Sequence, residues 1–182
     1  MRVIGGKYKG KSIKYDDKAS VRPTKDKVRE ALFSSIQTMI EDSKFLDLFA
    51  GSGSIGIEAL SRGASYVELV ENDRKSIATI KQNLNNLSDP ANIKVNHENT
   101  SAYLKKLKGS SMKFDIIFLD PPYLQGLDKK AAEEIINSDL LSDEGILIIE
   151  RDKHTDMINI DGLGNIKTKR FGNTCLDYFV KE

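Results

Sequence analysis

The stretch FLDLFAGSGSIG, residues 45–56, joins a short apolar strand to a helix through a glycine-rich turn. Gly51, Gly53 and Gly56 satisfy the pattern G-x-G-x-x-G. Glycines at these positions let the backbone turn tightly and approach a bound ligand closely. Glu71 ends the next apolar stretch, where a carboxylate can accept hydrogen bonds from the two hydroxyls of a ribose. The stretch therefore predicts a nucleotide-binding α/β fold.

Strand and helix patterns alternate along the chain from residue 45 onward. The expected strands are 45–49, 65–71, 92–97, 114–119, 145–150, 165–171 and 174–181, and the expected helices are 54–62, 73–87, 100–107 and 128–138. Alternation of this kind is typical of βαβ units with helices on both faces of a parallel sheet. The last two strands enclose Gly172-Asn173 and predict a terminal hairpin. The expected fold class is α/β, a Rossmann-like sheet that is mostly parallel and has an antiparallel last strand.

The N-terminal region precedes this alternating pattern. Residues 2–15 predict a short hairpin with glycines at its turns, and residues 25–41 have the apolar spacing of an amphipathic helix with Thr24 as its N-cap. A chain of 182 residues favours one domain. We expect a single domain over residues 1–182, with a basic hairpin or arm at 1–24 and the core at 25–182.

Positive charge is concentrated at the N-terminus, although the net charge of the chain is only +1. Residues 1–34 contain ten lysines and arginines against four acids, whereas the remainder contains eighteen against twenty-three. A basic arm on a mildly acidic body indicates a polyanionic partner, although a solvated surface has the same composition. Arg29 also fits plain helix-surface charge. The candidate phosphate contacts are Lys7, Lys9, Lys11, Lys14, Arg22, Lys25 and Arg29.

The bulk composition excludes several classes of protein. No apolar run approaches the roughly 20 residues that a membrane span needs, and the N-terminus lacks the apolar core of a secretory signal. The single cysteine, Cys175, cannot form an internal disulfide, so a reducing cytoplasm is the expected compartment. His97 and His154, the only histidines, lie far apart with no ligand cluster around them, which predicts no metal. A monomer is the default expectation.

Asp47 lies inside the strand just before the glycine turn. A carboxylate there disfavours a pyrophosphate but attracts the cationic amino group of S-adenosylmethionine, or a water bound to it. The spacing D-x-F-x-G-x-G resembles the first motif of class I methyltransferases, whose architecture also suits the antiparallel last strand. The expected cofactor-binding residues are Asp47, Phe49, Gly51, Gly53, Glu71, Asn72, Asn99 and Thr100. The glycine pattern alone leaves NAD open as the ligand.

Asn99 departs from the usual methyltransferase pattern, which often has an aspartate after the third strand to accept a proton of the adenine amino group. The side-chain carbonyl of Asn99 can accept the same hydrogen bond, while a backbone N–H contacts adenine N1.

Asp120-Pro121-Pro122-Tyr123 follows the strand 114–119, at the sheet edge where ligands bind in open α/β folds. Prolines stiffen the loop and lack N–H donors, so the Asp120 carboxylate and the Pro121 carbonyl are left as acceptors. An exocyclic amine with both protons on these acceptors directs its lone pair toward a sulfonium methyl. Tyr123 offers a face on which the target base can stack. All four residues are therefore the expected catalytic residues.

The tetrapeptide resembles the D/N-P-P-Y/F motif of amino-methyltransferases. It leaves the amine undefined, since adenine N6, cytosine N4, guanine N2 and a glutamine side chain all fit.

The surrounding residues resemble one family, the bacterial 16S rRNA guanine-N2 methyltransferase of the D type. The likeness covers MRVIGGKYKG at 1–10, RPT at 22–24, REALF at 29–33, DLFAGSGSIGIEALSRGA at 47–64, the tetrapeptide, and RFGNT at 170–174. The resemblance implies S-adenosylmethionine as cofactor, S-adenosylhomocysteine as product, and 16S rRNA in an assembling or assembled small subunit as partner. The implied target is N2 of one guanine.

Three other functions stay open from the sequence. An N6-adenine methyltransferase acting on DNA or RNA would use the same tetrapeptide, an NAD-dependent oxidoreductase would use the same glycine turn, and a non-catalytic RNA-binding module would need only the basic arm.

Overall fold

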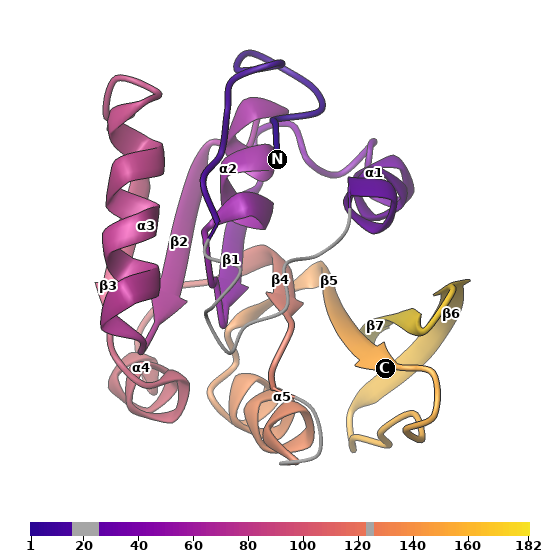
Figure 1. The fold of residues 1–182 in the computed structure, drawn as a ribbon. Coiled ribbons are helices and arrows are strands. Elements are labelled where there is room, and N and C mark those ends of the chain that lie inside the picture. Colours follow the sequence, from indigo (N-terminus) through magenta and orange to yellow (C-terminus); the bar gives the residue numbers. More distant parts are fainter. Residues whose placement is uncertain (16–25, 123–125) are drawn as a thin grey trace.

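The computed structural model describes residues 1–15, 26–122 and 126–182, and these form one seven-stranded sheet with the strand order β3-β2-β1-β4-β5-β7-β6 (Figure 1). The strands are β1 Lys44–Leu48, β2 Tyr66–Glu71, β3 Ile93–His97, β4 Phe114–Leu119, β5 Leu141–Asp152, β6 Leu163–Phe171 and β7 Thr174–Lys181. The helices are α1 Asp26–Ser35, α2 Ser54–Ser61, α3 Arg74–Asn85, α4 Thr100–Leu107 and α5 Leu127–Asn137. Strands β1 to β5 pair in parallel, and β7 is antiparallel to both β5 and β6. The predicted Rossmann-like class is confirmed.

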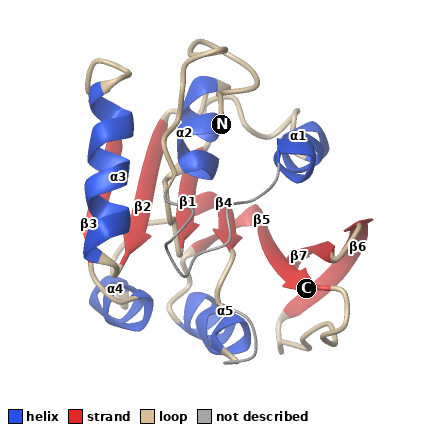
Figure 2. Ribbon diagram, in the orientation of Figure 1, coloured by secondary structure: helices blue, strands red, loops and turns tan. Residues whose placement is uncertain are grey.

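The helices cover both faces of the sheet, and each face has its own apolar core (Figure 2). On one face, α1, α2 and α3 contribute Leu32, Ile57 and Ile80 to the first core. On the other face, α4 and α5 contribute Leu104 and Ile135 to the second. Because β1 and β4 are covered on both sides, their apolar residues run almost continuously instead of alternating.

The register of the central strands brings three sequence-predicted residues to one edge. Leu48, at the end of β1, pairs with Val70 of β2 and with Leu119 of β4. The next residue along each strand is Phe49, Glu71 or Asp120. In parallel strands these positions emerge side by side beyond the carboxyl ends, which is where open α/β sheets bind ligands.

Two N-terminal elements differ from the prediction. Helix α1 ends at Ser35 and does not continue to residue 41. The chain turns there, and Asp42 adopts a positive φ of 59°, while Ile36 and Ile40 stay buried and so continue the apolar spacing without a helix. The predicted hairpin at 2–15 is present in a minimal form: it has one antiparallel bridge, Arg2 to Ser12, flanked by backbone hydrogen bonds from Val3 to Lys11 and from Ile13 to Met1. The expected N-cap, Thr24, lies outside the described residues.

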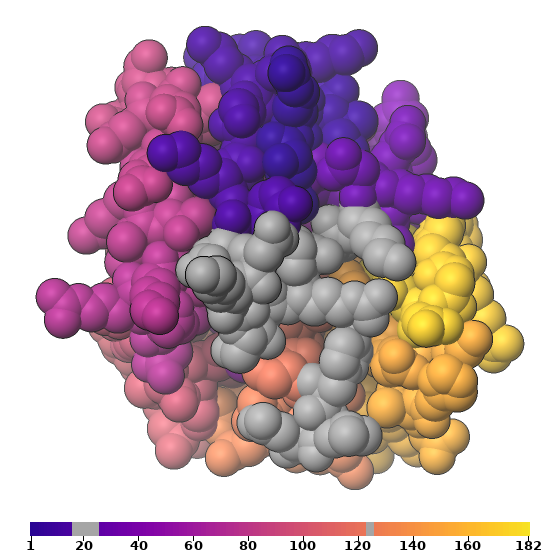
Figure 3. Space-filling model, viewed as in Figure 1, coloured from indigo at the N-terminus to yellow at the C-terminus, as the bar shows by residue number. Residues whose placement is uncertain are grey.

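The N-terminal segment, residues 1–15, is docked on the body of the protein. The amide groups of Ile4 and Gly5 each donate to a carboxylate oxygen of Glu58 in α2, both at 2.8 Å. The amide of Lys14 donates to Oδ1 of Asn83 in α3 at 2.8 Å, and Nδ2 of Asn83 donates back to the Lys14 carbonyl at 2.9 Å. Figure 3 shows the segment, in indigo, lying against α3. Its backbone therefore forms hydrogen bonds to α2 and α3 in addition to those within the segment.

Candidate active site

A pocket of about 620 Å³ opens at the carboxyl ends of β1, β2 and β4. Its wall combines the three strand ends with the first turns of α3 and α4 and one side of α5. The lining residues are Phe49, Val70, Glu71, Asn72, Asp73, Arg74, Asn99, Thr100, Ser101, Asp120, Pro121, Pro122, Leu127, Lys130, Ala131 and Glu134. The volume suits a nucleoside-sized ligand, since small-molecule sites span roughly 300–1,000 Å³.

The glycine turn forms its tight bend with residues of positive φ, namely Phe49 at 67°, Gly51 at 56° and Gly53 at 76°. Gly56 has a different role, in packing. A Cβ on Gly56 would lie 2.2 Å from Cδ2 of Leu69, so only glycine lets α2 approach β2 this closely. The positive φ values therefore set the shape of the turn, and the absence of a side chain on Gly56 lets α2 pack closely against β2.

Glu71 ties the glycine turn to the β2–α3 loop. Its Oε2 accepts the amide of Gly51 at 2.7 Å, and its Oε1 accepts the amides of Asn72 and Asp73 at 2.8 and 2.7 Å. A carboxylate offers about four lone-pair sites, so Oε2 retains capacity for a further donor. Glu71 thus lies at the pocket wall as a preorganised acceptor suited to a ribose hydroxyl.

Asp47 lies behind the glycine turn and is not part of the pocket wall. Only 2% of it is exposed, and its Oδ2 accepts the amide of Gly56 at 3.1 Å. Burial raises the pKa of Asp47 to about 8, and the negative charge of Glu71 acts in the same direction. Burial therefore favours the neutral carboxyl, and a cation placed near the turn would favour its ionisation.

The structure places the predicted cofactor residues in two groups. Phe49, Glu71, Asn72, Asn99 and Thr100 line the pocket. Asp47, Gly51 and Gly53 shape and hold the turn beside it.

The expected adenine contact of the Asn99 carbonyl stays a prediction, and the structure shows two backbone amides that compete for the same oxygen. Asn99 is the N-cap of α4, and its Oδ1 accepts the amides of Ser101 at 2.8 Å and Ala102 at 3.3 Å. A helix N-terminus leaves its first amides without partners, so a cap of this type is strongly favoured. The Asn99 carbonyl thus already has two donors from the helix that it caps.

Asp120, Pro121 and Pro122 all line the pocket directly beyond β4. Pro121 is buried and Asp120 is half-buried, so the loop is packed against the body of the protein. Tyr123 lies outside the described residues.

Sequence reasoning missed four charged residues of the pocket wall, namely Asp73, Arg74, Lys130 and Glu134. Oε1 of Glu134 accepts a hydrogen bond from the Ser101 hydroxyl at 2.9 Å, which joins α5 to the first turn of α4. The signal in the sequence was available: Glu134 follows Leu127 and Ala131 at helical spacing, on the side of α5 that faces the pocket.

The structure describes some of the residues predicted to contact RNA and leaves others outside the described ranges. Lys7, Lys9 and Lys11 are exposed on the N-terminal segment, with Nζ of Lys7 lying 5.3 Å from the ring centroid of Tyr8. Arg22 and Lys25 fall outside the described residues.

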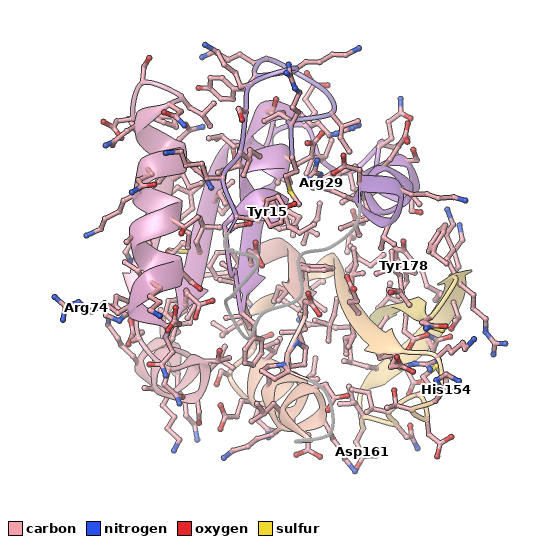
Figure 4. The ribbon with its side chains drawn as sticks, viewed as in Figure 1. Tyr15, Arg29, Arg74, His154, Asp161 and Tyr178 are labelled. Atoms are coloured by element: carbon pink, nitrogen blue, oxygen red, sulfur yellow. The ribbon has the colours of Figure 1, made fainter. Side chains whose placement is uncertain are left out.

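The prediction that Arg29 contacts phosphate is wrong, because this side chain is fully buried. It points from α1 toward the N-terminal segment (Figure 4), where Nη2 donates to the carbonyl of Arg2 and lies 3.1 Å from Oδ1 of Asp26. Its Nε lies 3.7 Å from Oε2 of the buried Glu58. Burial lowers the pKa of the Arg29 guanidinium, and the Glu58 carboxylate opposes that shift. Arg29 thus anchors the N-terminal segment from inside.

Known proteins resemble this chain over most of its length. The family model described as conserved hypothetical protein 95 matches residues 1–180. The chain is 38% identical over 156 residues to ribosomal RNA small subunit methyltransferase D of Buchnera aphidicola, covering 86% of this chain and 80% of that protein. The chain belongs to this family.

Two solved structures have the same fold as this chain. A putative methyltransferase, yhhF, from Escherichia coli superimposes with a TM-score of 0.88 at 30% identity, covering 100% of this chain and 98% of that one. A putative methyltransferase, SMU.776, complexed with S-adenosylhomocysteine shares the fold, with a TM-score of 0.70 at 16% identity over 88% of this chain and 50% of that one. The chain therefore belongs to a family whose named members are methyltransferases, and its fold is that of a structure with bound S-adenosylhomocysteine.

The geometry of the pocket also fits S-adenosylmethionine. It has an acceptor for a ribose hydroxyl in Glu71, a glycine turn of positive φ, and a buried carboxyl behind the turn in Asp47. No group of three or more potential metal-ligating side chains occurs within residues 1–15, 26–122 and 126–182. No helix in the same ranges is long and apolar enough to cross a membrane.

Proposed function

We propose that this protein transfers a methyl group from S-adenosylmethionine to the exocyclic N2 of a guanine in 16S rRNA, within the small ribosomal subunit. The observation that carries the proposal is the presence of Asp120, Pro121 and Pro122 in the wall of the same pocket as Glu71. An amine-recognising loop and a ribose acceptor in one cavity support methyl transfer to a planar amine more than binding alone.

The substrate assignment is supported by relatives. The Buchnera protein is named as a ribosomal RNA small subunit methyltransferase. The exposed Lys7, Lys9 and Lys11 of the N-terminal segment supply positive charge for an RNA backbone. The proposed RNA-binding residues further include Arg22 and Lys25.

The chemistry follows from the acceptors in the loop. The Asp120 carboxylate and the Pro121 carbonyl accept the two N–H bonds of the amine and so aim its lone pair into the pocket. Bound S-adenosylmethionine supplies an electrophilic methyl on a sulfonium. The nitrogen forms a bond to that carbon while the S–C bond breaks and its electron pair stays on sulfur. Asp120 stabilises the positive charge that develops on the amine, which then loses a proton to solvent.

The test is mass mapping of methylated nucleosides in small subunits from a strain lacking this activity, incubated with the protein and tritiated cofactor. N2-methylguanine in 16S rRNA is the expected product. Label in N6-methyladenine would overturn the guanine assignment in favour of an adenine methyltransferase.

Two controls separate the remaining functions. Asp120→Ala should abolish methyl transfer with RNA binding largely retained, whereas a non-catalytic RNA-binding module has no transfer to lose. Calorimetry should detect S-adenosylhomocysteine binding and no NADH binding; the reverse result would identify a nicotinamide site.

A further inference from the structure

The edge strand β6 and the turn after it carry a second concentration of positive charge. Residues 163–176 contain two lysines, one arginine and no acidic residue, whereas residues 35–182 as a whole contain eighteen basic and twenty-three acidic residues. We call Lys167, Lys169 and Arg170 the basic edge. Lys167 and Arg170 are exposed and Lys169 is half-buried. None of the three forms an ion pair with a carboxylate of residues 1–15, 26–122 or 126–182, so their charge is available to an anionic partner.

The pleat of β6 turns the two lysines toward the face of the sheet that α1 covers. Thr168, between them, points to the other face, where its Oγ1 donates to the buried Asp177 at 2.6 Å. Nζ of Lys169 donates to Oγ of Ser35 at the end of α1, also at 2.6 Å. Figure 3 shows the β6–β7 hairpin, in orange and yellow, on the same face of the molecule as the N-terminal segment. Thr168 therefore fixes the strand, and Lys167 and Lys169 project beside α1.

The two lysines are held together despite their like charge. The pKa of Lys169 is lowered, first by partial burial and then by the positive charge of Lys167. Neighbouring cations repel each other, and an anion bound between them relieves that repulsion.

Two simpler roles explain only part of this charge. A lysine on an edge strand discourages pairing with another chain, and a cation beside the last turn of α1 complements the helix dipole. One lysine is enough for each role. Neither role accounts for an adjacent pair of lysines followed by an arginine, with no acidic residue between them.

The register of the sheet places the basic edge level with the loop beyond β4. Asp120 follows β4 and is level with Glu150 of β5. Glu150 pairs with Leu176 of β7, and Leu176 pairs with Lys169 of β6. Neighbouring strands lie about 4.8 Å apart, so three steps separate the backbones of Asp120 and Lys169 by roughly 14 Å. The N-terminal segment is docked on α2 and α3 and lies on the other side of β4 (Figure 1).

We propose that the basic edge contacts the phosphate backbone of the substrate RNA, on the opposite side of Asp120 from the N-terminal segment. The identity of this RNA rests on the proposed function. Enzymes that act on a base extrude it from its stack at an energetic cost, and phosphate contacts set the position of the strand while the base enters the site. Contacts on both sides of Asp120 hold the strand on both sides of the extruded base.

The test is the salt dependence of binding to 16S rRNA, measured by fluorescence anisotropy, for the unmodified protein and for Lys167→Gln/Lys169→Gln/Arg170→Gln. Each lost phosphate contact lowers the slope of log K against log salt by about 0.7–0.9, so the slope should fall by about 2–3. With small subunits as substrate, KM should rise by about 10-fold or more while kcat stays within about 2-fold, because the changed residues do not touch the reacting atoms. Calorimetric binding of S-adenosylhomocysteine should be unchanged.

The matched control is Lys105→Gln/Lys108→Gln/Lys129→Gln. It removes the same charge from exposed positions at α4 and α5, which cover the other face of the sheet (Figure 2), and it should change the slope by less than about 0.5. If the β6 variant melts more than about 5 °C below the unmodified protein, Lys167→Gln/Arg170→Gln takes its place. This pair keeps the contact between Lys169 and Ser35 and should lower the slope by about 1–2.

An unchanged slope and KM in the β6 variant would overturn the RNA contact. An equal loss in the control variant would attribute the effect to net charge and would also overturn it. A higher KM for small subunits with an unchanged slope for free 16S rRNA would replace the RNA by an acidic protein surface of the subunit. If the unmodified protein binds 16S rRNA without methylating it, the proposed function fails, and the comparison of slopes still decides whether the basic edge contacts RNA.

Discussion

Replacing Arg29 with methionine should destabilise the protein without removing an RNA contact. The side chain is fully buried, and its guanidinium donates to the Arg2 carbonyl and faces the carboxylate of Glu58. Removal of one member of a buried ion pair costs about 3–5 kcal/mol. Glu58 would retain three donors, the amides of Ile4 and Gly5 and Nε of Arg62 at 2.7 Å. We therefore expect a loss near the lower limit, about 3 kcal/mol.

Urea denaturation followed by circular dichroism measures this loss directly, and the melting temperature should fall by roughly 6–12 °C. Lys27→Met is the matched control, because Lys27 is exposed on the same helix and should change the stability by less than about 0.5 kcal/mol. The affinity for RNA should be measured well below the melting temperature, where Arg29→Met stays folded. A variant with unchanged stability but a weaker dependence of RNA binding on salt would refute this reasoning, because it would place Arg29 on the RNA-binding surface.

Three further predictions follow from buried or exposed charge. Because the pKa of Asp47 is raised to about 8, the folded protein holds a proton that the unfolded chain releases near pH 4, and this contribution to stability declines as the pH rises from about 4 to 8. Asp47→Asn should lack this decline in urea unfolding at pH 5 and pH 8, and an identical decline in both proteins would contradict the assignment. Tyr103→Phe removes a 2.8 Å donor from the buried Glu68 and should cost about 1–3 kcal/mol in thermal unfolding, whereas Thr79→Ala, at an exposed hydrogen bond, should cost less than about 1 kcal/mol. Changing Lys7, Lys9 and Lys11 together to glutamine should reduce the salt dependence of RNA binding, measured by fluorescence anisotropy, by about 2–3 in log–log slope, and an unchanged slope would move the RNA contact elsewhere.

The central fold follows from local signals that the sequence carries in full. Strands β1 and β4 are apolar at nearly every position, and helices α3, α4 and α5 are buried along one side, so their positions are predicted to within a few residues. The glycine turn is equally local, because positive φ and close packing at Gly53 and Gly56 require glycine whatever surrounds them.

Side-chain roles are less predictable, because they depend on partners that are distant in the sequence. The charge of Arg29 indicates a surface residue until Glu58 and the Arg2 carbonyl are brought against it. Asn99 has the right position for adenine, but the helix that starts beside it supplies two amides that compete for its carbonyl. Glu134 lies in a helix whose composition is that of any amphipathic helix, and only its contact with Ser101 reveals where it points.

The N-terminal segment is held on the body of the protein by hydrogen bonds close to the glycine turn. The side chain of Asn83 is almost completely buried; its Oδ1 accepts the amide of Lys14, and its Nδ2 donates to the carbonyl of Lys14. The same Nδ2 also donates to the carbonyl of Ser52 in the glycine turn at 2.9 Å. The N-terminal segment and the cofactor turn are thereby bonded to the same side chain. A freely moving arm would lose conformational entropy each time it bound RNA, whereas a docked segment has already lost it on folding. Lys7, Lys9 and Lys11 are therefore better understood as fixed points on the same rigid body as the methyl-transfer pocket, which suits them to setting the position of an RNA relative to Asp120.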